Sequence, residues 1–242
     1  MIRKKAFTLK KNSIRWRSNE PTRLETFSDA VFAFAVTLII VSLEVPKSFD
    51  ELFETMKGFV SFGVCFALLF LIWNNQNIFF RRYGIVDAYV TFLNGVLLFL
   101  VLIYTYPLKF LFTLVLSDDN TYLSHGVKLS MIRVEQVSTL MYVYDLGYLL
   151  IYLLFYLMYK HAQGNAEKLE LTDYELFETR SQMYINLLNV LIGVFAIIVT
   201  FILPENAKGA SGYVYFLLPV VYPIFFTIRV RTHFQCKKYQ NS

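Results

Sequence analysis

The residues of this sequence best placed to do chemistry are polar side chains that interrupt long apolar runs. Asp29 lies in the first run, residues 73–77 lie in the second, and Asn94 lies in the third. If the runs are helices, a rise of about 1.5 Å per residue places Asp29 about 10 Å, and residues 73–77 about 6–12 Å, from the same edge of an apolar layer. Because a central Asp in a membrane costs about 2.5–3.5 kcal/mol, each such group requires a partner.

These depths predict a hydrogen-bonded layer that ties the first helix to the second and third. Interhelical amides are commonly structural, and the same layer is also suited to line an aqueous vestibule, so both interpretations stay open. Asp29 is predicted to bond with partners among Arg23, Ser28, Trp73 and Gln76. The full layer comprises Asp29, Trp73, Asn74, Gln76, Asn77 and Asn94, with Asn186 and Asn189 at similar depth on the fifth run.

Other chemistry-bearing residues give weaker patterns. Asp145 lies nearer the opposite edge, close in sequence to Tyr142, Tyr144 and Tyr148. This pattern predicts a carboxylate that is satisfied by a tyrosine or lies in an interface. The three histidines are scattered, with no metal-ligand spacing and no nucleophile–base pair, which argues against a membrane-embedded enzyme. They are His125, His161 and His233.

The elements that position these groups follow from composition. The chain has 242 residues, of which 56% are hydrophobic and 17% charged, whereas soluble domains average about 25% charged residues. Runs of roughly 20 apolar residues span a bilayer as helices, so the sequence predicts an all-α membrane protein with six transmembrane helices. Thr22 and Glu25 form a capping box that starts the first helix. The spans are expected at about 24–45, 53–80, 86–107, 138–159, 183–203 and 212–228, with Pro107 marking a stop or kink.

The orientation follows from the basic residues, since cytoplasmic segments carry an excess of Lys and Arg. Most of the 23 Lys and Arg residues fall on the side of the N-terminus, which places both termini in the cytosol. Residues 1–21 are predicted to be a basic cytosolic arm held near anionic lipid, 22–228 the transmembrane domain, and 229–242 a basic tail. This distribution favours a membrane partner over nucleic acid. The acidic segment 163–180 is predicted to be a solvated loop or interfacial helix.

One motif carries a resemblance to a known family. Arg23, Phe27, Ser28 and Asp29 spell R-x-x-x-F-S-D at the start of the first span, followed by an apolar continuation. This pattern resembles the transmembrane protein 175 family of endolysosomal potassium channels and their six-helix prokaryotic homologues. The resemblance implies a pore lined by the first helix and, for prokaryotic forms, four subunits around a central axis.

The same resemblance assigns roles along the first helix. It implies a constriction at Phe34, a selectivity-related hydroxyl at Thr37 and a further apolar layer at Val41; with Leu38, these residues share one helical face at i, i+3, i+4 and i+7. That face is expected to line the pore, while Phe32 and Ile39 face other helices. Two positions depart from the family pattern: Phe34 replaces the usual Ile or Leu, and Gln76, which does not ionise, replaces a His.

The function indicated is a leak-like potassium channel of moderate potassium-over-sodium selectivity, in which a hydrophobic constriction controls conduction. No TVGYG-type filter and no voltage-sensor pattern of arginines occurs. The alternative is an oligomeric six-helix secondary transporter. Against it, the sequence has no charged pair at mid-membrane, and its first helix has no Gly or Pro break of the kind that exposes a substrate site. The expected partners are three further copies, potassium ions and membrane lipids, with no cofactor. The expected location is a prokaryotic plasma membrane.

Overall fold

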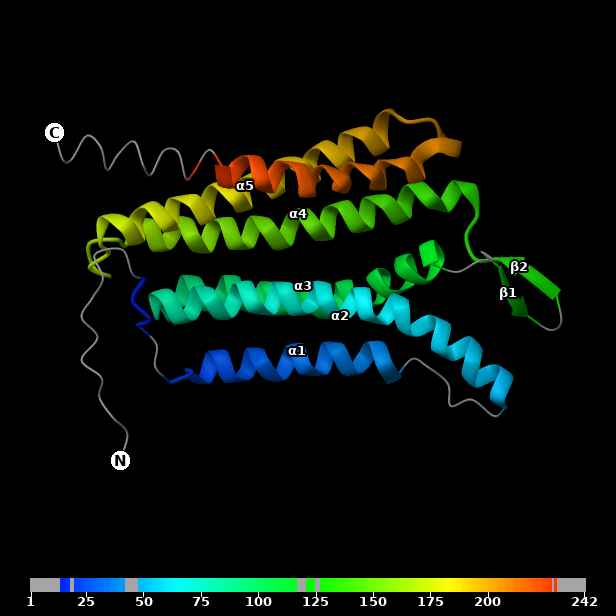
Figure 1. Cartoon of the computed structure of the whole chain (residues 1–242), viewed down its shortest axis with the longest axis horizontal. Coiled ribbons are helices and arrows are strands. Elements are labelled where there is room, and N and C mark those ends of the chain that lie inside the picture. The colour runs from blue at the N-terminus through cyan, green and yellow to red at the C-terminus, as the bar shows by residue number, and fades with distance from the viewer. Residues whose placement is uncertain are drawn as a thin grey trace.

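The computed structural model describes residues 14–17, 20–41, 48–116, 121–124, 127–227 and 229 of the chain. Within these residues the chain forms long helices, a short hairpin and a 3-10 segment (Figure 1). The helices are α1 (Arg23–Val41), α2 (Phe49–Tyr83), α3 (Ala88–Leu116), α4 (Val134–Gly164) and α5 (Asp173–Ile202), followed by the 3-10 helix η1 (Glu205–Leu217). The chain continues from η1 as α-helix over residues 218–227.

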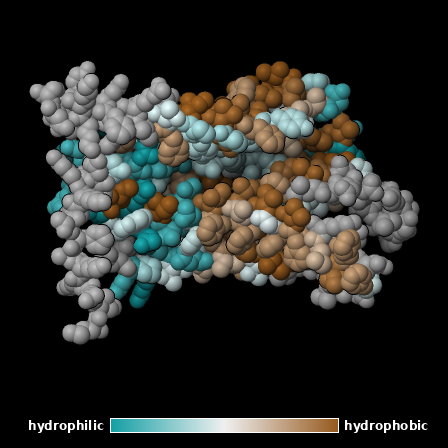
Figure 2. Space-filling model, viewed as in Figure 1, coloured by the Kyte–Doolittle hydropathy of each residue, from teal (hydrophilic) through white to brown (hydrophobic). Residues whose placement is uncertain are grey.

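The helices run side by side along the long axis of the molecule (Figure 1). Helix α1 packs on α2 and α3, α3 packs on α4, and α4, α5 and η1 pack on one another. The main apolar core joins buried side chains of α1 through α4, and a smaller cluster joins α5 to η1. Figure 2 shows hydrophobic residues over the middle of the surface and hydrophilic residues gathered at the end where α1 begins and α2 ends.

Five described segments are long and apolar enough to cross a membrane: Gly58–Tyr83, Ala88–Val115, Val134–Gly164, Asp173–Ile202 and Glu205–Thr227. The chain is therefore a multi-pass membrane protein. Helix α1 is shorter as described, with 19 residues, and it carries Arg23, Glu25 and Asp29 in its first two turns. Residues 42–45 of the predicted first span lie outside the described residues.

Several predicted boundaries are corrected by the structure. Of the two outcomes predicted at Pro107, a stop or a kink, the stop is excluded, because helix α3 continues through Pro107 to Leu116. The sixth helical segment begins at Glu205 rather than near residue 212. Two antiparallel strands, β1 (Thr121–Ser124) and β2 (Val127–Ser130), form a hairpin that the sequence analysis did not predict.

The acidic segment 163–180, predicted to be a solvated loop or an interfacial helix, forms turns over residues 165–170 and then the first turns of α5. Helix α4 extends to Gly164, and α5 begins at Asp173 behind a capping box between Thr172 and Glu175. Glu175 and Glu178 are buried, with 3% and 6% exposed. The physical reason is that both carboxylates are paired with arginines from distant parts of the chain, which compensates for their loss of hydration.

Candidate functional site: helix α1 and its polar anchors

The start of α1 is fixed by the predicted capping box. The backbone N–H of Thr22 donates to Oε1 of Glu25 at 3.0 Å, and the backbone N–H of Glu25 donates to Oγ1 of Thr22 at 3.3 Å. These two bonds satisfy backbone donors that the first helical turn otherwise leaves without partners. Arg23 and Phe27 of the motif are exposed on this turn. The motif therefore begins at a defined helix start.

Helix α1 has a covered face and an uncovered one. Phe32, Ala35 and Ile39 are at most 5% exposed, because they pack against the other helices of the chain. This confirms the prediction that Phe32 and Ile39 face other helices. On the opposite side Phe34 is 56% exposed, Thr37 is exposed and Leu38 is half-buried. The side chain of Val41 lies outside the described residues.

A chain of hydrogen bonds joins the N-terminal half of α1 to α2 and α3. Nε2 of Gln76 donates to Oδ1 of Asn94 at 2.6 Å, and Nδ2 of Asn94 donates to Oγ of Ser28 at 3.0 Å. The Ser28 hydroxyl in turn donates to the carbonyl of Leu24 at 2.8 Å. Gln76, Asn94 and Ser28 are each at most 2% exposed. The predicted hydrogen-bonded layer between the first three helices is therefore present, and its bonds run in one direction, from Gln76 through Asn94 and Ser28 to the carbonyl of Leu24.

Asp29 has a separate anchor. Nε1 of Trp73 donates to Oδ1 of Asp29 at 2.7 Å, which confirms Trp73 as one of the predicted partners. Asn74 and Asn77 are half-buried on the same stretch of α2. Asn186 and Asn189 do not join this network: Asn189 bonds with Tyr148 and Tyr222 instead. Equal depth predicted one layer, but Asn186 donates to the carbonyl of Gln182 in its own helix, and Asn189 bonds within the group formed by α4, α5 and the C-terminal segment.

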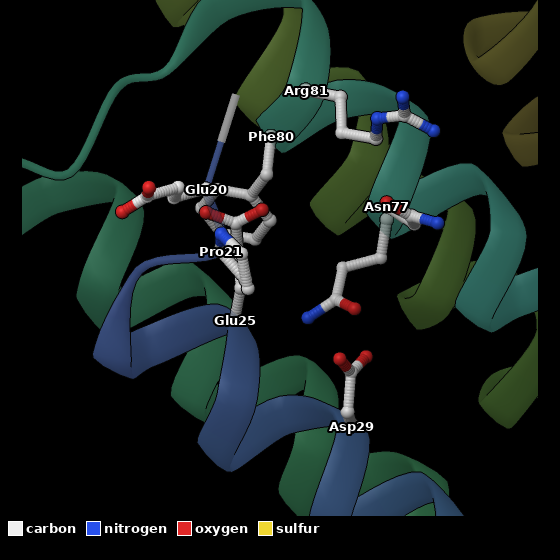
Figure 3. Close-up of a pocket in the computed structure, with 8 residues that line it drawn as sticks. Glu20, Pro21, Glu25, Asp29, Asn77, Phe80 and Arg81 are labelled. Atoms are coloured by element: carbon white, nitrogen blue, oxygen red, sulfur yellow. The ribbon is translucent and has the colours of Figure 1, made fainter. Parts of the chain in front are cut away.

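A cavity of about 270 Å³ lies between the N-terminal turn of α1 and the C-terminal turns of α2 (Figure 3). In Figure 3, Asp29 extends from α1 into the space between the two helices. Its lining holds three carboxylates and one guanidinium, so the local charge favours cations. The lining residues are Glu20, Pro21, Glu25, Asp29, Gln76, Asn77, Phe80 and Arg81.

The segment that precedes α1 docks on the protein through its arginines. Nη2 of Arg15 and of Arg17 lie 3.1 Å and 2.9 Å from Oε2 of Glu175 at the start of α5. The backbone N–H of Arg17 donates to the carbonyl of Arg81 at 3.0 Å, and the Arg81 guanidinium lies 4.6 Å from the centre of the Trp16 ring. The predicted contact of residues 1–21 with anionic lipid falls largely on residues 1–13, which lie outside the described residues, while Arg15 and Arg17 bind the carboxylate of Glu175.

A second ion-pair group continues this contact across the same end of the molecule. Nη1 of Arg82 lies 3.4 Å from Oε1 of Glu178, and Arg229 pairs with Oε2 of the same carboxylate. The hydroxyls of Tyr83 and Thr179 are hydrogen-bonded at 2.8 Å. Together these contacts join the end of α2 to α5 and to the C-terminal segment. Sequence reasoning missed these contacts, because the density of charge in 163–180 indicates ionic interactions but does not identify their partners.

Asp145 lies on α4 within the second group of helices. The Tyr215 hydroxyl donates to Oδ1 at 2.7 Å, and the Thr200 hydroxyl lies 3.1 Å from Oδ2. Asp145 is 1% exposed. The prediction of a tyrosine partner is confirmed, but the tyrosine comes from η1 rather than from α4. Among the described residues, no group of three or more His, Cys, Asp or Glu side chains is placed to hold a metal ion.

The fold and site together define a class: a multi-pass membrane protein whose first helix has one anchored and one uncovered face beside an acidic cavity. The sequence matches the family described as "Endosomal/lysosomal potassium channel TMEM175" over residues 23–107, which include α1, α2 and most of α3. A Marivirga tractuosa protein named "Potassium channel" is 38% identical over 218 residues, covering 87% of this chain and 88% of that protein. The chain belongs to the TMEM175 family.

Solved structures agree with this assignment. A crystal structure of a variant of the potassium channel MtTMEM175, in complex with a nanobody–MBP fusion protein, matches with a TM-score of 0.76 and 36% identity. That match covers 90% of this chain and 97% of the other. The crystal structure of a lysosomal potassium-selective channel TMEM175 homolog from Chamaesiphon minutus has the same fold, with a TM-score of 0.55 at 23% identity over 84% of this chain and 95% of that one.

Proposed function

We propose that this chain is the subunit of a potassium-conducting channel in which the α1 helices of four copies surround a central pore. Family membership and the relatives named as potassium channels support the ion. The observation that carries the pore assignment is the asymmetry of α1. Phe32, Ala35 and Ile39 pack inside the subunit, whereas the face with Phe34 and Thr37 is left uncovered by its own chain.

The uncovered face supplies the chemistry that a simple cation pore needs. Rings of apolar side chains at Phe34, Leu38 and Val41 form a hydrophobic constriction, which controls conduction by excluding water. The hydroxyl of Thr37 donates its hydrogen to the carbonyl of Ala33 at 2.9 Å. Its oxygen therefore presents lone pairs rather than a hydrogen, which suits contact with a partly dehydrated potassium ion. A single oxygen layer gives moderate potassium-over-sodium selectivity and a leak-like current.

The cavity between α1 and α2 serves as the inner vestibule. Its carboxylates raise the local concentration of cations next to the pore helix, because charge of one sign in a cleft attracts counter-ions. With both termini in the cytosol, this vestibule opens to the cytosolic side of a prokaryotic plasma membrane. The subunit needs no cofactor in this role; its partners are three further copies, potassium ions and membrane lipids.

The test is reconstitution of the purified protein into liposomes with a potassium gradient, followed by planar-bilayer recording. Reversal potentials under bi-ionic potassium and sodium give the permeability ratio. Phe34→Asn and Val41→Asn are expected to raise the current by wetting the constriction. Thr37→Val is expected to lower the permeability ratio more than the conductance, because it removes the hydroxyl and keeps the shape.

Phe195→Asn provides a matched control, since Phe195 is 49% exposed but lies on α5. It is expected to leave both readouts unchanged. Unaltered conductance and reversal potential in all three α1 variants, in intact oligomers, would refute the assignment of this face to the pore. Loss of turnover in all three, with saturable uptake in place of a current, would indicate the transporter instead.

A further inference from the structure

The last described turn of α1 receives a cation from another helix. The carbonyls at the C-terminal end of a helix carry a partial negative charge, which favours a nearby basic side chain. The last described turn of α1 carries no basic residue of its own. Lys109 of α3 supplies one: its Nζ donates to the backbone carbonyl of Ile39 at 2.9 Å. The contact joins residues 70 positions apart in the sequence.

The placement of Lys109 is costly and therefore informative. It lies two residues after Pro107, inside the membrane-spanning segment Ala88–Val115 of α3. Ionised side chains at such positions are expensive unless they bind a partner, and they commonly mark functional sites. No part of the vestibule or of the amide chain at the other end of α1 uses this lysine. Its contact is with the pore helix itself.

The contact lies next to the residues assigned to the pore. Ile39 follows Thr37 by two residues, a rise of about 3 Å along the helix. On the other side of Thr37, the hydrogen bonds from Trp73 to Asp29 and from Asn94 to Ser28 anchor α1, and the nearer of the two, at Asp29, lies about 15 Å from Ile39 by helical rise. Between these two points α1 is held by apolar contacts of Phe32 and Ala35. Apolar contacts are non-directional, so they restrain rotation of the helix less than hydrogen bonds do.

We propose that Lys109 is a positioning residue for ion selectivity: its bond to Ile39 fixes the rotation and height of the outer half of α1, so that Thr37 faces the pore axis. The proposal rests on the proposed function, because it assumes that the uncovered face of α1 lines the pore. A competing role is purely electrostatic, in which the ammonium only repels cations from the outer end of the pore. The two roles predict different measurements.

The experiment compares Lys109→Met, which keeps a long unbranched side chain without the donor, with Lys109→Arg, which keeps donor and charge. Removing a membrane-embedded charge does not hinder insertion, so Lys109→Met is expected to assemble. The control is Lys208→Met, which removes an outer basic residue paired with Glu205 near the start of η1. Bi-ionic reversal potentials give the potassium-to-sodium permeability ratio, and amide hydrogen exchange reports the stability of the outer half of α1.

We expect Lys109→Met to lower the permeability ratio about threefold, within the range of coupling that a contact one turn away carries, and to speed exchange in the outer half of α1. Lys109→Arg is expected to keep the wild-type permeability ratio and exchange rate, and Lys208→Met is expected to change neither quantity. In combination with Thr37→Val the effect on the ratio is expected to be less than additive, because Lys109 acts through Thr37.

Unchanged permeability ratio and exchange in Lys109→Met would overturn the proposal. A changed conductance with an unchanged ratio would also overturn it, in favour of the electrostatic role. Failure of the proposed function is distinguishable, because it appears as absence of potassium current in the wild-type protein. In that case the selectivity role is refuted with it, while the exchange measurement still decides whether Lys109 anchors α1.

Discussion

The amide chain from Gln76 through Asn94 to Ser28 makes a quantitative prediction about how α1 is held. Asn94→Leu removes one hydrogen bond accepted from Gln76 at 2.6 Å and one donated to Ser28 at 3.0 Å. Interhelical hydrogen bonds in membranes contribute about 0.6 kcal/mol each on average. The larger effect is the Nε2 donor of Gln76, which is left buried without an acceptor at a cost of about 1–3 kcal/mol. The total loss is about 3 kcal/mol before apolar packing of the new leucine offsets part of it.

The double variant Gln76→Leu with Asn94→Leu isolates the stranded donor. Because no polar group is then left without a partner, the double variant is expected to lose about 1 kcal/mol less than the sum of the two single variants. Asn74→Leu is the matched control. Asn74 is half-buried on α2, the helix that carries Gln76, and its side chain makes no hydrogen bond with another described residue, so Asn74→Leu is expected to lose little stability.

Unfolding is measured by titrating the detergent-solubilised protein with denaturing detergent, with Trp73 fluorescence as a local signal. Potassium-to-sodium permeability of the reconstituted variants reports whether α1 has also moved. Equal stability of Asn94→Leu and the wild-type protein would refute the reasoning, and so would strict additivity in the double variant. Either result would mean that the chain of amides does not hold α1 to α3.

Three further predictions concern the end of the molecule where α1 begins. Glu175→Gln is expected to release the segment before α1, at a cost of about 2 kcal/mol in stability. Breaking a buried ion pair costs about 3–5 kcal/mol, and this cost is reduced here because the side chains of Arg15 and Arg17 are 34% and 19% exposed. Trypsin cleavage at these arginines is then expected to speed up, and a rate equal to that of the exposed-site control Glu167→Gln would contradict this. Asp87 accepts from the backbone N–H of Val90 at 2.8 Å, so Asp87→Ala is expected to lose about 1 kcal/mol of helix capping. Burial raises the pKa of Asp87, but the bonds from Val90 and His161 outweigh this and lower its pKa below the ordinary value of 3.8. Because the folded-state pKa is lowered, the ionised Asp87 stabilises the protein at pH values above its unfolded-state pKa. This stabilisation is lost as the pH falls through the folded-state pKa, so the stability difference between wild type and Asp87→Asn is expected to close below about pH 4. A difference that persists unchanged to pH 3 in thermal unfolding would contradict it.

Local sequence signals were sufficient for much of α1. The capping box of Thr22 and Glu25 specified its start, because its two partners are three residues apart. The apolar period separated Phe32 and Ile39 from Phe34 and Thr37, since helical geometry alone decides which residues share a face. The pairing of Trp73 with Asp29 was within reach because both are polar groups at one depth in an apolar layer.

Depth alone did not identify the partners of the other polar groups. Asn94 and Asn189 were expected at similar depth, yet Asn94 bonds with Ser28 and Asn189 bonds with Tyr148 and Tyr222. The reason is that a helix presents polar groups in all directions around its axis. The rotation of each helix, and the order in which helices neighbour one another, select the bonds that form.

The sequence by itself determined that this chain spans a membrane with long helices, where α1 begins, and which side of α1 is packed. Those properties depend on apolar length, periodicity and contacts within one turn. Only the tertiary structure decided that Glu175 binds Arg15 and Arg17, that Asp145 binds Tyr215, and that Lys109 reaches Ile39. These pairs lie 160, 158, 70 and 70 residues apart. Such contacts depend on which helices the packed core brings together, and no local pattern encodes that choice.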